Sequence, residues 1–493
     1  MKGAGGFRGG IENRAKKNAQ IEKEVRMEKE VQMEKGENQI RVAFHTLGCK
    51  VNSYETEVMQ QAILKKGYRL VDFEEEAEVY IINTCSVTNI ADRKSRQMLH
   101  KAREKNPAAL IIAAGCYAQT RGEEELLLDG VDLVVGNNKK SQIGDIVENR
   151  LSMLEDIAKE SSYEDMQLES TTDHTRCFIK IQDGCNQFCS YCIIPFARGR
   201  VRSRRQEEIC QEVERLAGKG YREFVLTGIH LSSYGMDLVP REEADKNNWL
   251  KYNRLINIIE RIAAIEGVDR IRLGSLEPRI ITEEFADRLS RIKKLCPHFH
   301  LSLQSGCDET LRRMNRHYDG QEYYHGLELL RESFLRQNGC LPAITTDVIV
   351  GFPGETEEEF EKSRAFIEKC GFYETHIFKY SKRKNTRAAL MEGQLTDRQK
   401  SERSEVLRKL NEEKQRTYIE YICGGGFVSE LLVEETVEID GKQYFTGFTK
   451  EYIRAIFEYP QDICGKIVRG RLELSEKRLA GQLICNMTQI SVK

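Results

Sequence analysis

The sequence predicts an α/β protein made of three successive parts, of which the last is all-β. Strand-like and helix-like segments alternate over residues 39–150, and a longer alternation of the same kind covers residues 176–402. After Gly424-Gly-Gly426 only short β-like segments follow. The expected all-β part covers residues 416–490. Regular alternation is typical of parallel sheets with helices on their faces, whereas a run of short strands is typical of a small all-β barrel or sandwich.

Residues 1–38 differ from the rest of the chain. They begin with glycines, continue with a charged stretch and contain no broad apolar face, so we expect a disordered tail without chemistry. They also lack the apolar segment of a signal peptide, and apolar runs elsewhere, such as 108–114, are too short to span a bilayer. We therefore expect a cytoplasmic protein without a membrane partner.

The composition limits the partners and the cysteine chemistry. Lys and Arg number 76 against 78 Asp and Glu, so no overall positive field favours nucleic acid, and RNA binding would need local patches or shape. The chain has 15 cysteines. Without an export signal, metal-binding or redox thiols explain them better than disulfides do.

The first part places a cysteine after each of its first three expected strands. Strands are expected at 42–47, 79–84, 110–114 and 133–135, and helices at about 53–67, 89–105, 119–128 and 140–149. The cysteines are Cys49, Cys85 and Cys116. Because parallel strands end at the same edge of a sheet, the three thiols are expected to converge there on one ligand. Buried structural cysteine is the alternative for each one alone, but three successive strand ends favour a shared site.

The second part predicts six β/α units, short of the eight of a complete barrel. A polar, acidic linker with a short helix and a hairpin lead-in is expected before it, over 151–175. Expected strands lie at 178–182, 223–227, 270–274, 298–304, 345–350 and 374–380; expected helices lie at about 206–219, 252–266, 282–293, 308–338 with a break near His317, and 356–370.

The loop after the first barrel strand contains Cys185, Cys189 and Cys192 at the spacing C-x3-C-x2-C. A structural zinc site needs four ligands, whereas three thiolates suit a four-iron cluster whose fourth iron stays free for a substrate. The same argument applies to the three strand-end cysteines of the first part. A zinc knuckle or three unrelated loop thiols is the alternative. Active sites of barrels lie at the carboxyl ends of the strands, so this loop also predicts where the site is.

Polar residues at the other strand ends are candidates for cofactor or substrate binding. They lie in 227–230, 275–278, 304–306 and 351–355. Each alone is compatible with an ordinary turn, but four on one face favour a cofactor pocket. Five of the eight residues from Arg198 to Arg205 are arginine, a side chain suited to phosphate or carboxylate. We expect Arg198, Arg200 and Arg202 to bind substrate, the alternative being a solvated lead-in to the next helix.

A charged helix over 397–421 is expected to lead out of the barrel into the all-β part. Expected strands lie at 427–433, 436–439, 444–449, 452–457, 467–474 and 480–487. From 416 to 493 there are ten Lys and Arg against eleven Asp and Glu, so the charge alone predicts no nucleic-acid surface.

With Tyr191 before its last cysteine, the C-x3-C-x2-C loop resembles the signature of radical S-adenosylmethionine (SAM) enzymes. The resemblance implies a partial (βα)6 radical SAM barrel and a cluster whose open iron binds SAM. It also implies SAM contacts at the strand ends, for which the candidates are Thr227, Gly228, Glu277, Gln304 and Gly351. The Gly-Gly-Glu usual after the second strand is represented here only by Thr227-Gly228-Ile229. The all-β part resembles the TRAM domain, a small RNA-binding barrel.

As a whole, residues 39–490 resemble the methylthiotransferases. Thr46–Glu57 and Lys180–Pro195 are similar to the branch that modifies N6-threonylcarbamoyladenosine (t6A) in tRNA. The branch acting on isopentenyladenosine usually has Gln-Met in place of Lys50-Val51, and the branch acting on a ribosomal-protein aspartate usually has Pro-Lys after the first cysteine. Those two substrates are the first alternatives, and a non-catalytic metal-binding RNA protein is the alternative from another class.

The resemblance implies the following chemistry. Cys185, Cys189 and Cys192 hold the 4Fe–4S cluster that cleaves SAM, and the resulting radical removes hydrogen from C2 of adenosine 37 in the anticodon loop. Cys49, Cys85 and Cys116 hold an auxiliary 4Fe–4S cluster that carries the sulfur, and a second SAM supplies the methyl group. The implied partners are tRNA and an electron donor protein, and the base is expected to be unstacked to reach the site.

Overall fold

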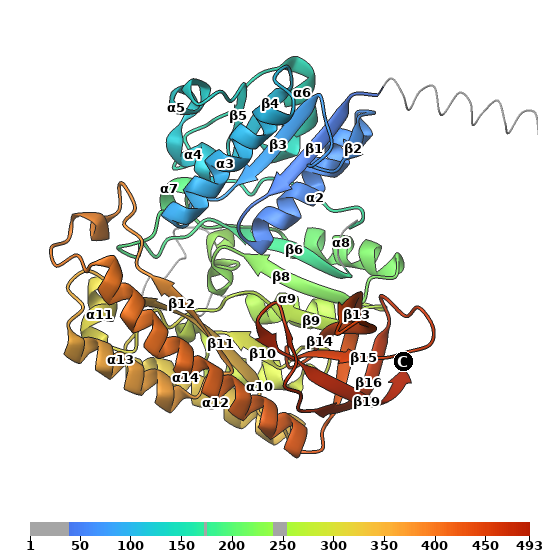
Figure 1. Cartoon of the computed structure of the whole chain (residues 1–493), viewed down its shortest axis with the longest axis vertical. Helices are drawn as coiled ribbons and strands as arrows, with labels where there is room; N and C mark the ends of the chain where they lie inside the picture. The colour runs from blue at the N-terminus through green and yellow to red at the C-terminus, as the bar shows by residue number, and fades with distance from the viewer. Residues whose placement is uncertain (1–38, 172–174, 240–253) are drawn as a thin grey trace, which may run out of the picture.

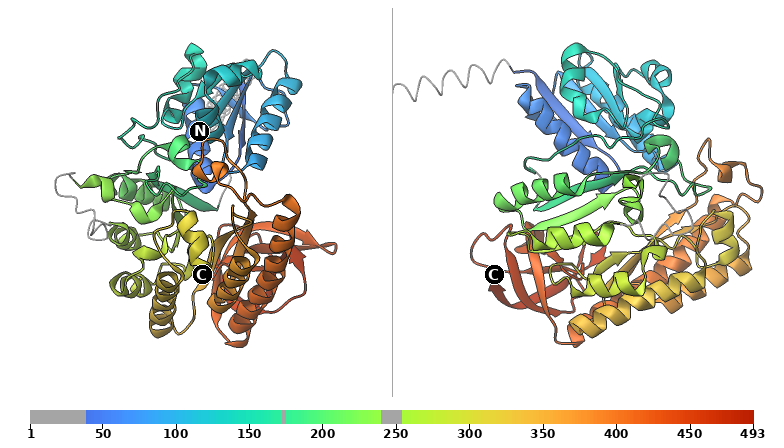
Figure 2. Two further views of the ribbon diagram at one scale, coloured as in Figure 1. Left: turned by 90° about the vertical axis from the view of Figure 1, so that its left-hand side faces the viewer. Right: turned by 180° about the vertical axis from the view of Figure 1, so that it is seen from behind.

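The computed structural model describes residues 39–171, 175–239 and 254–493. The disordered tail expected over 1–38 lies outside these residues. An N-terminal sheet domain stands at one end of the molecule, the barrel lies below it, and the C-terminal strands pack beside the lower half (Figure 1). The two further views of Figure 2 show the same arrangement, with the N-terminal domain at one end in both.

The N-terminal domain is a parallel sheet with the strand order β2-β1-β3-β4-β5. Its elements are β1 (Arg41–Thr46), α2 (Lys50–Lys65), β2 (Arg69–Val71), β3 (Val79–Thr84), α3 (Asn89–Lys105), β4 (Leu110–Gly115), α4 (Cys116–Arg121), α5 (Glu123–Leu128), β5 (Leu133–Val135) and α6 (Ile143–Asn149). Alternate residues of each strand enter two separate cores, one with α3 and one with α2 and α6. Both faces are therefore covered, as expected for a buried parallel sheet.

Two helices of this domain differ from the expectation. The helix expected at 119–128 is two short helices, because Gly122 between them has a φ of +83°. The helix expected to begin at residue 53 begins at Lys50, so that Cys49 is its N-cap residue. The first cysteine of the trio therefore lies at a helix start rather than within a loop.

The barrel follows the expected order of strands and helices. Its elements are β6 (Arg176–Asp183), α7 (Ile194–Arg198), β7 (Arg202–Ser203), α8 (Gln206–Gly218), β8 (Glu223–Gly228), α9 (Leu255–Ala264), β9 (Arg270–Leu273), α10 (Glu283–Arg291), β10 (His298–His300), α11 (Asp308–Arg313), α12 (Gly320–Asn338), β11 (Ala343–Val350), α13 (Glu357–Cys370) and β12 (Glu374–Lys379). Strands β6, β8 and β9 pair in parallel, as do β10, β11 and β12. Single parallel bridges, Ile271 to Leu295 and Leu276 to Leu301, connect the two sets. The expected break near His317 is confirmed, since Asp319 caps a new helix there.

The linker carries no helix and no strand in its described residues 151–171, so the expected short helix and hairpin lead-in are wrong. Its apolar side chains are used for packing instead. Met166 and Leu168 are buried in the main barrel core together with Tyr54 of α2. The Tyr54 hydroxyl donates to the Met166 carbonyl at 2.7 Å. The linker thus fills the interface between the first two parts.

Helix α14 (Asp397–Gly424) leads into a closed barrel with the order β13-β14-β15-β19-β16. Its elements are β13 (Val428–Ile439), β14 (Lys442–Thr449), β15 (Arg454–Phe457), β16 (Ile467–Glu473), β17 (Arg478–Leu479), β18 (Gln482–Leu483) and β19 (Cys485–Val492). The first two expected strands are one strand with a bulge between Val433 and Glu435. The last expected strand, 480–487, is displaced to β19. The reason is that Ala480 and Gly481, with φ of +49° and +83°, turn the preceding residues into the β17–β18 hairpin.

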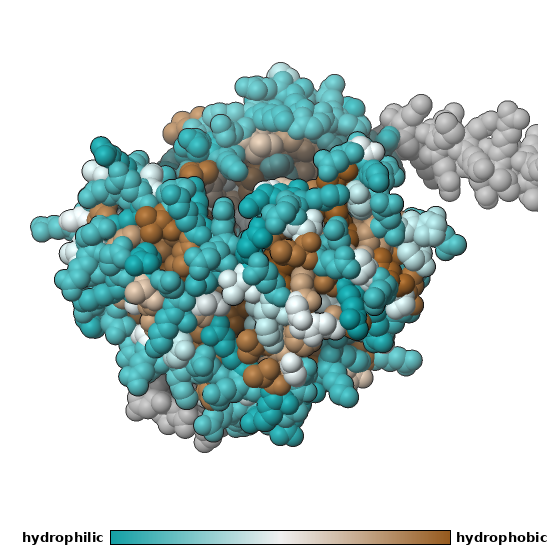
Figure 3. Space-filling model, turned by 60° about the horizontal axis from the view of Figure 1, so that its bottom comes forward, coloured by the Kyte–Doolittle hydropathy of each residue, from teal (hydrophilic) through white to brown (hydrophobic). Residues whose placement is uncertain are grey.

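Within the described residues, no helix combines the length and apolar character needed to cross a bilayer. On the face drawn in Figure 3, hydrophobic residues lie in small groups between hydrophilic ones.

Candidate iron–sulfur and cofactor site

The loop with Cys185, Cys189 and Cys192 is fixed at its start by a glycine. Gly184 has a φ of +71°, and a Cβ there would lie 1.8 Å from the Arg200 carbonyl oxygen. The Cys185 N–H donates to the Gly199 carbonyl at 3.0 Å. Only glycine therefore lets the two ends of the loop lie this close together.

The middle of the loop is fixed by Ser190. Its N–H donates to the Met314 carbonyl at 2.9 Å, and its hydroxyl donates to the Arg313 carbonyl at 2.8 Å. Its own carbonyl accepts from the Ala388 N–H at 2.8 Å. These contacts come from the segments after α11 and β12, so the far side of the barrel holds the cysteine loop in place.

The three thiols of this loop are partly buried and have hydrogen-bond donors beside them. The Gln187 N–H lies 3.5 Å from Cys185 Sγ, and Arg316 Nη1 lies 3.3 Å from Cys189 Sγ. Burial raises the pKa of Cys185 to about 12. It also raises the pKa of Cys192, with the neighbouring Cys189 thiol adding to the shift. Metal binding would replace the protons of these thiols.

The second trio lies at the carboxyl ends of β1, β3 and β4. A Cβ on Gly48 would lie 2.9 Å from both Cβ and Sγ of Cys85, so the loops after β1 and β3 are in contact. Burial raises the pKa of Cys85 to about 11, and the charges of Cys116 and Cys49 add to this shift. The structure therefore brings the strand-end cysteines Cys49, Cys85 and Cys116 together.

Neither trio is closed enough for a single metal ion. Among the described residues, only His300, Asp347 and His376 place three ligand atoms within 4.8 Å of one another. A tetrahedral zinc ion with bonds of about 2.3 Å would hold its sulfur atoms roughly 3.8 Å apart. Neither cysteine trio meets this limit, and the three thiolates of each trio suit a four-iron cluster with one open iron.

Arg198 connects the second trio with the barrel. Its Nε lies 3.3 Å from Cys116 Sγ, and its Nη1 lies 3.1 Å from Asp183, the last residue of β6, which precedes the other cysteine loop. The same Nη1 donates to Glu55 of α2 at 2.8 Å, and Nη2 donates to Asn52 Oδ1 at 2.6 Å. Arg198 has no exposed surface. One buried guanidinium thus joins the N-terminal domain to the barrel beside Cys116.

Glu55 is the centre of this buried charge cluster. It pairs with Lys140 of its own domain and, at 2.7 Å, with Lys180 of β6, in addition to Arg198. Burial alone would raise the pKa of Glu55, but Arg198, Lys140 and Lys180 outweigh burial and hold this pKa well below its usual value. The carboxylate is therefore ionised across the interface between the first two parts.

The three arginines differ in exposure. Arg198 and Arg202 are buried, and Arg202 Nη1 donates to the carbonyls of Arg198 and Arg200. Substrate binding by Arg198 and Arg202 stays a prediction. Arg200 is exposed, and its guanidinium lies 4.6 Å from the centre of the Phe188 ring. Substrate binding by Arg200 stays a prediction. The sequence could not show that Arg198 pairs with an acid 143 residues earlier.

Of the expected SAM-binding residues, Glu277 lies next to the cysteine loop. Gln187 Nε2 lies 3.3 Å from its carboxylate, as does His230 Nε2. Burial alone would raise the pKa of Glu277, but His230 and Arg279 lower it to about 2. The buried, ionised carboxylate thus lies at the mouth of the barrel, paired with Arg279 and His230. Gln187, inside the cysteine motif, is a contact that the sequence analysis missed.

The other four expected residues lie at strand ends of the same mouth. Thr227 is buried, and a Cβ on Gly228 would lie 2.9 Å from the side-chain oxygen of Gln182. Gln304 and Gly351 have φ of +70° and +69°. The residue after Gly351, Phe352, meets the Tyr191 ring edge-on at 6.3 Å between centroids. Contact of these residues with SAM stays a prediction.

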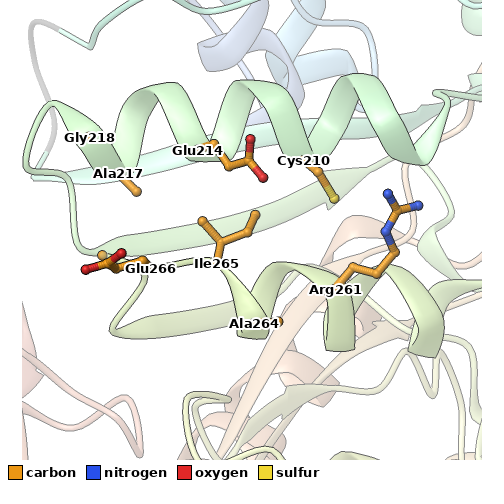
Figure 4. A pocket seen from close by; sticks show the side chains of 9 residues that line it. Cys210, Glu214, Ala217, Gly218, Arg261, Ala264, Ile265 and Glu266 are labelled. Carbon is orange, nitrogen blue, oxygen red and sulfur yellow. The ribbon is translucent and has the colours of Figure 1, made fainter.

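A pocket of about 800 Å³ lies away from this mouth, between α8 and α9 (Figure 4). Cys210, Glu214 and Arg261 are among its lining residues. None of the six cysteines and none of the expected SAM-binding residues lines it, so it has no part in the candidate site.

Comparison with known proteins gives relatives along most of the chain. Residues 41–136 match the "Uncharacterized protein family UPF0004", and residues 179–367 match the "Radical SAM superfamily". Threonylcarbamoyladenosine tRNA methylthiotransferase MtaB of Bacillus subtilis is 41% identical over 87% of this chain and 93% of its own length. The protein of that name from Aquifex aeolicus is 39% identical over 80% and 93%.

A relative from the other tRNA branch is more distant. The tRNA-2-methylthio-N(6)-dimethylallyladenosine synthase of Clostridium botulinum strain Loch Maree is 31% identical, over 87% of this chain and 93% of that protein. These relatives match 80–87% of this chain. The chain belongs to the radical SAM methylthiotransferase family.

Proposed function

We propose that this protein transfers a methylthio group to C2 of t6A at position 37 of tRNA, with SAM and two 4Fe–4S clusters as cofactors. The observation that carries the proposal is the pair of three-cysteine sites, on two domains that Arg198 joins beside Cys116. The names of the relatives at 39–41% identity support t6A as the substrate, against the dimethylallyl branch at 31%. The protein acts in the cytoplasm, on the anticodon loop, with an electron donor protein.

In this proposal Cys185, Cys189 and Cys192 hold the cluster that cleaves SAM, and Cys49, Cys85 and Cys116 hold the auxiliary cluster. When bound, the clusters and SAM supply the radical that removes hydrogen from C2 and the sulfur and methyl group that replace it. The closed C-terminal barrel, which resembles a TRAM domain, contributes to tRNA binding.

The side chains of the protein fix and shield this chemistry. Arg198 fixes the auxiliary site against the barrel, because it contacts Cys116 and also Asp183, which precedes the SAM-cleaving loop. Ser190 holds the SAM-cleaving loop against the barrel. Glu277 presents an ionised carboxylate at the mouth, where it is suited to an ammonium or hydroxyl group of SAM. Pre-positioning of this kind is what a site with two cofactors and a base requires.

The substrate is tested by nucleoside mass spectrometry of tRNA from a strain that lacks this protein. We expect 2-methylthio-t6A to disappear and t6A to accumulate, because no sulfur is then inserted at C2. The wild-type gene restored on a plasmid is the control. Persistence of 2-methylthio-t6A at an unchanged level, with no second enzyme present, would show that the substrate is wrong. Zinc in place of iron after anaerobic purification, with no SAM cleavage, would favour the non-catalytic alternative.

Gly48→Ala is expected to damage the auxiliary site selectively. The new Cβ would press on Cys85 at 2.9 Å, at a φ of +101° that alanine disfavours. We expect about half of the iron to be lost and methylthio transfer to fall more than roughly tenfold, while SAM cleavage stays measurable. Gly67→Ala is the matched control, since Gly67 has a φ of +84° but no atom within 4 Å of the added Cβ. Equal iron contents in the two variants would contradict the expectation.

A further inference from the structure

Lys50 is a cation between the auxiliary site and the barrel that has no ion-pair partner among the described residues. It follows Cys49 directly as the first residue of α2, and its side chain is exposed. The ammonium group of Lys50 forms no hydrogen bond and no ion pair with any residue that the structure describes. The charged groups that act on it include Arg176 of β6, Arg272 of β9 and Glu223 of β8. Lys50 thus extends from the N-terminal domain towards the strands of the barrel.

The two arginines near Lys50 already have carboxylate partners. Arg272 Nε pairs with Glu223 at 3.1 Å, while its Nη1 and Nη2 donate to the carbonyls of Lys450 and Thr449. Arg176 Nε pairs with Glu434 at 3.0 Å. Both guanidinium groups therefore have carboxylate partners, which leaves Lys50 as the cation of this group that is free to bind a ligand.

An aromatic stack lies beside the same cations. The ring of Tyr452 is stacked between His298 of β10, at 4.3 Å, and Phe448 of β14, at 4.6 Å. Arg272 lies over the Tyr452 ring at 4.9 Å, and Arg176 lies over the Phe448 ring at 5.3 Å. This stack joins the barrel to the C-terminal domain, with Tyr452 held between two rings.

The charges around Lys50 do not balance. Arg270 also pairs with Glu223, at 2.7 Å, so that two arginines share this one carboxylate. With Arg176 and Lys50 there are four cations against the carboxylates of Glu223 and Glu434. An unpaired ammonium in a region of excess positive charge is suited to an anionic ligand group.

We infer that Lys50 binds the carboxylate of the threonylcarbamoyl group and thereby selects t6A, an inference that rests on the proposed function. In the purine ring only N1 separates C6, which carries this substituent, from C2, where sulfur is inserted. The substituent must therefore lie near the auxiliary site when C2 does, and Lys50 adjoins a ligand of that site. An uncharged isopentenyl group would leave Lys50 without a counter-ion, which opposes binding.

The test uses the reconstituted full-length holoenzyme and two synthetic anticodon stem–loop RNAs. One carries t6A, and the other carries the same group with its carboxylate replaced by a carboxamide. For the wild-type protein we expect kcat/KM for methylthio transfer to be about ten- to a hundredfold lower on the carboxamide RNA than on the t6A RNA. A decrease of this size is expected when one hydrogen bond to a charged group is lost. Lys50→Gln should act equally weakly on both RNAs, and Lys50→Arg should restore the preference for the carboxylate.

Controls separate the possible outcomes. Lys65→Gln removes a surface charge from the same helix, which pairs with Glu169, and should behave as wild type. Equal rates of the wild-type protein on the two RNAs would overturn the inference, whether or not Lys50→Gln folds. A preference that survives in Lys50→Gln would also overturn it, because another group would then recognise the carboxylate. Transfer to an isopentenyladenosine RNA but not to the t6A RNA would instead reject the proposed function.

Discussion

A Cys189→Ala protein is expected to lose about half of its iron and all of its SAM cleavage. Cys189 lies between the two other thiols of its loop, and Arg316 Nη1 is 3.3 Å from its sulfur. Two thiolates do not hold the SAM-binding cluster in place, and no other group of the chain can make the radical. The measurements are the iron and sulfide content after anaerobic reconstitution and the yield of 5′-deoxyadenosine from SAM with a chemical reductant.

Cys210→Ala is the matched control for the loss of a buried thiol. Cys210 is a buried residue of α8 in the pocket of Figure 4, and it has no ligand spacing to any other cysteine. Its replacement should leave the iron content and the 5′-deoxyadenosine yield at their wild-type values. Retention of SAM cleavage by Cys189→Ala would refute the assignment of this loop.

Glu55→Gln is expected to lower the free energy of unfolding by about 3–5 kcal/mol, the cost of removing one partner from a buried ion pair. The change leaves Lys140, Lys180 and Arg198 buried without the carboxylate that pairs with all three of them. Urea unfolding of the iron-free protein at pH 7 measures the effect. Glu169→Gln, which breaks the exposed pair with Lys65, is the control and should cost less than about 1 kcal/mol.

The same cluster gives stability a defined dependence on pH. The folded-state pKa of Glu55 is held well below its usual value, so ionised Glu55 stabilises the protein fully above the unfolded pKa of about 4.3. This contribution is lost as the pH falls from there through the folded-state pKa. The difference between wild type and Glu55→Gln should therefore shrink below about pH 4. A difference that stays constant from pH 7 to pH 3 would contradict this origin of the effect.

Local sequence patterns predicted most of the fold. Apolar runs fixed the strands, and the rule that parallel strands end at one edge was enough to bring Cys49, Cys85 and Cys116 together. Charge pairing was not predictable in this way. The arginine-rich stretch was expected to bind substrate or to be solvated, and only the folded chain shows Arg198 buried against Glu55.

The errors in the C-terminal part have a local cause. Residues 480–487 were expected to form one strand. Ala480 and Gly481 have positive φ and make a hairpin turn instead. Strand β19, which pairs with β16, begins only at Cys485. The short helix and hairpin lead-in expected in the linker were wrong for a different reason. The few apolar residues of the linker follow no helical or strand period, and they pack against two other parts of the chain.

The position of Glu55 has a consequence for the protein while it is being synthesised. Lys140 belongs to the same domain, but Lys180 and Arg198 are 125 and 143 residues beyond Glu55. Chain growth of about 5–20 residues per second means that the N-terminal domain leaves the ribosome seconds before these partners do. During that interval the sulfur of Cys116 is not yet covered by Arg198. The N-terminal domain thus exists for seconds with Glu55 paired only to Lys140 and with Cys116 without its arginine partner.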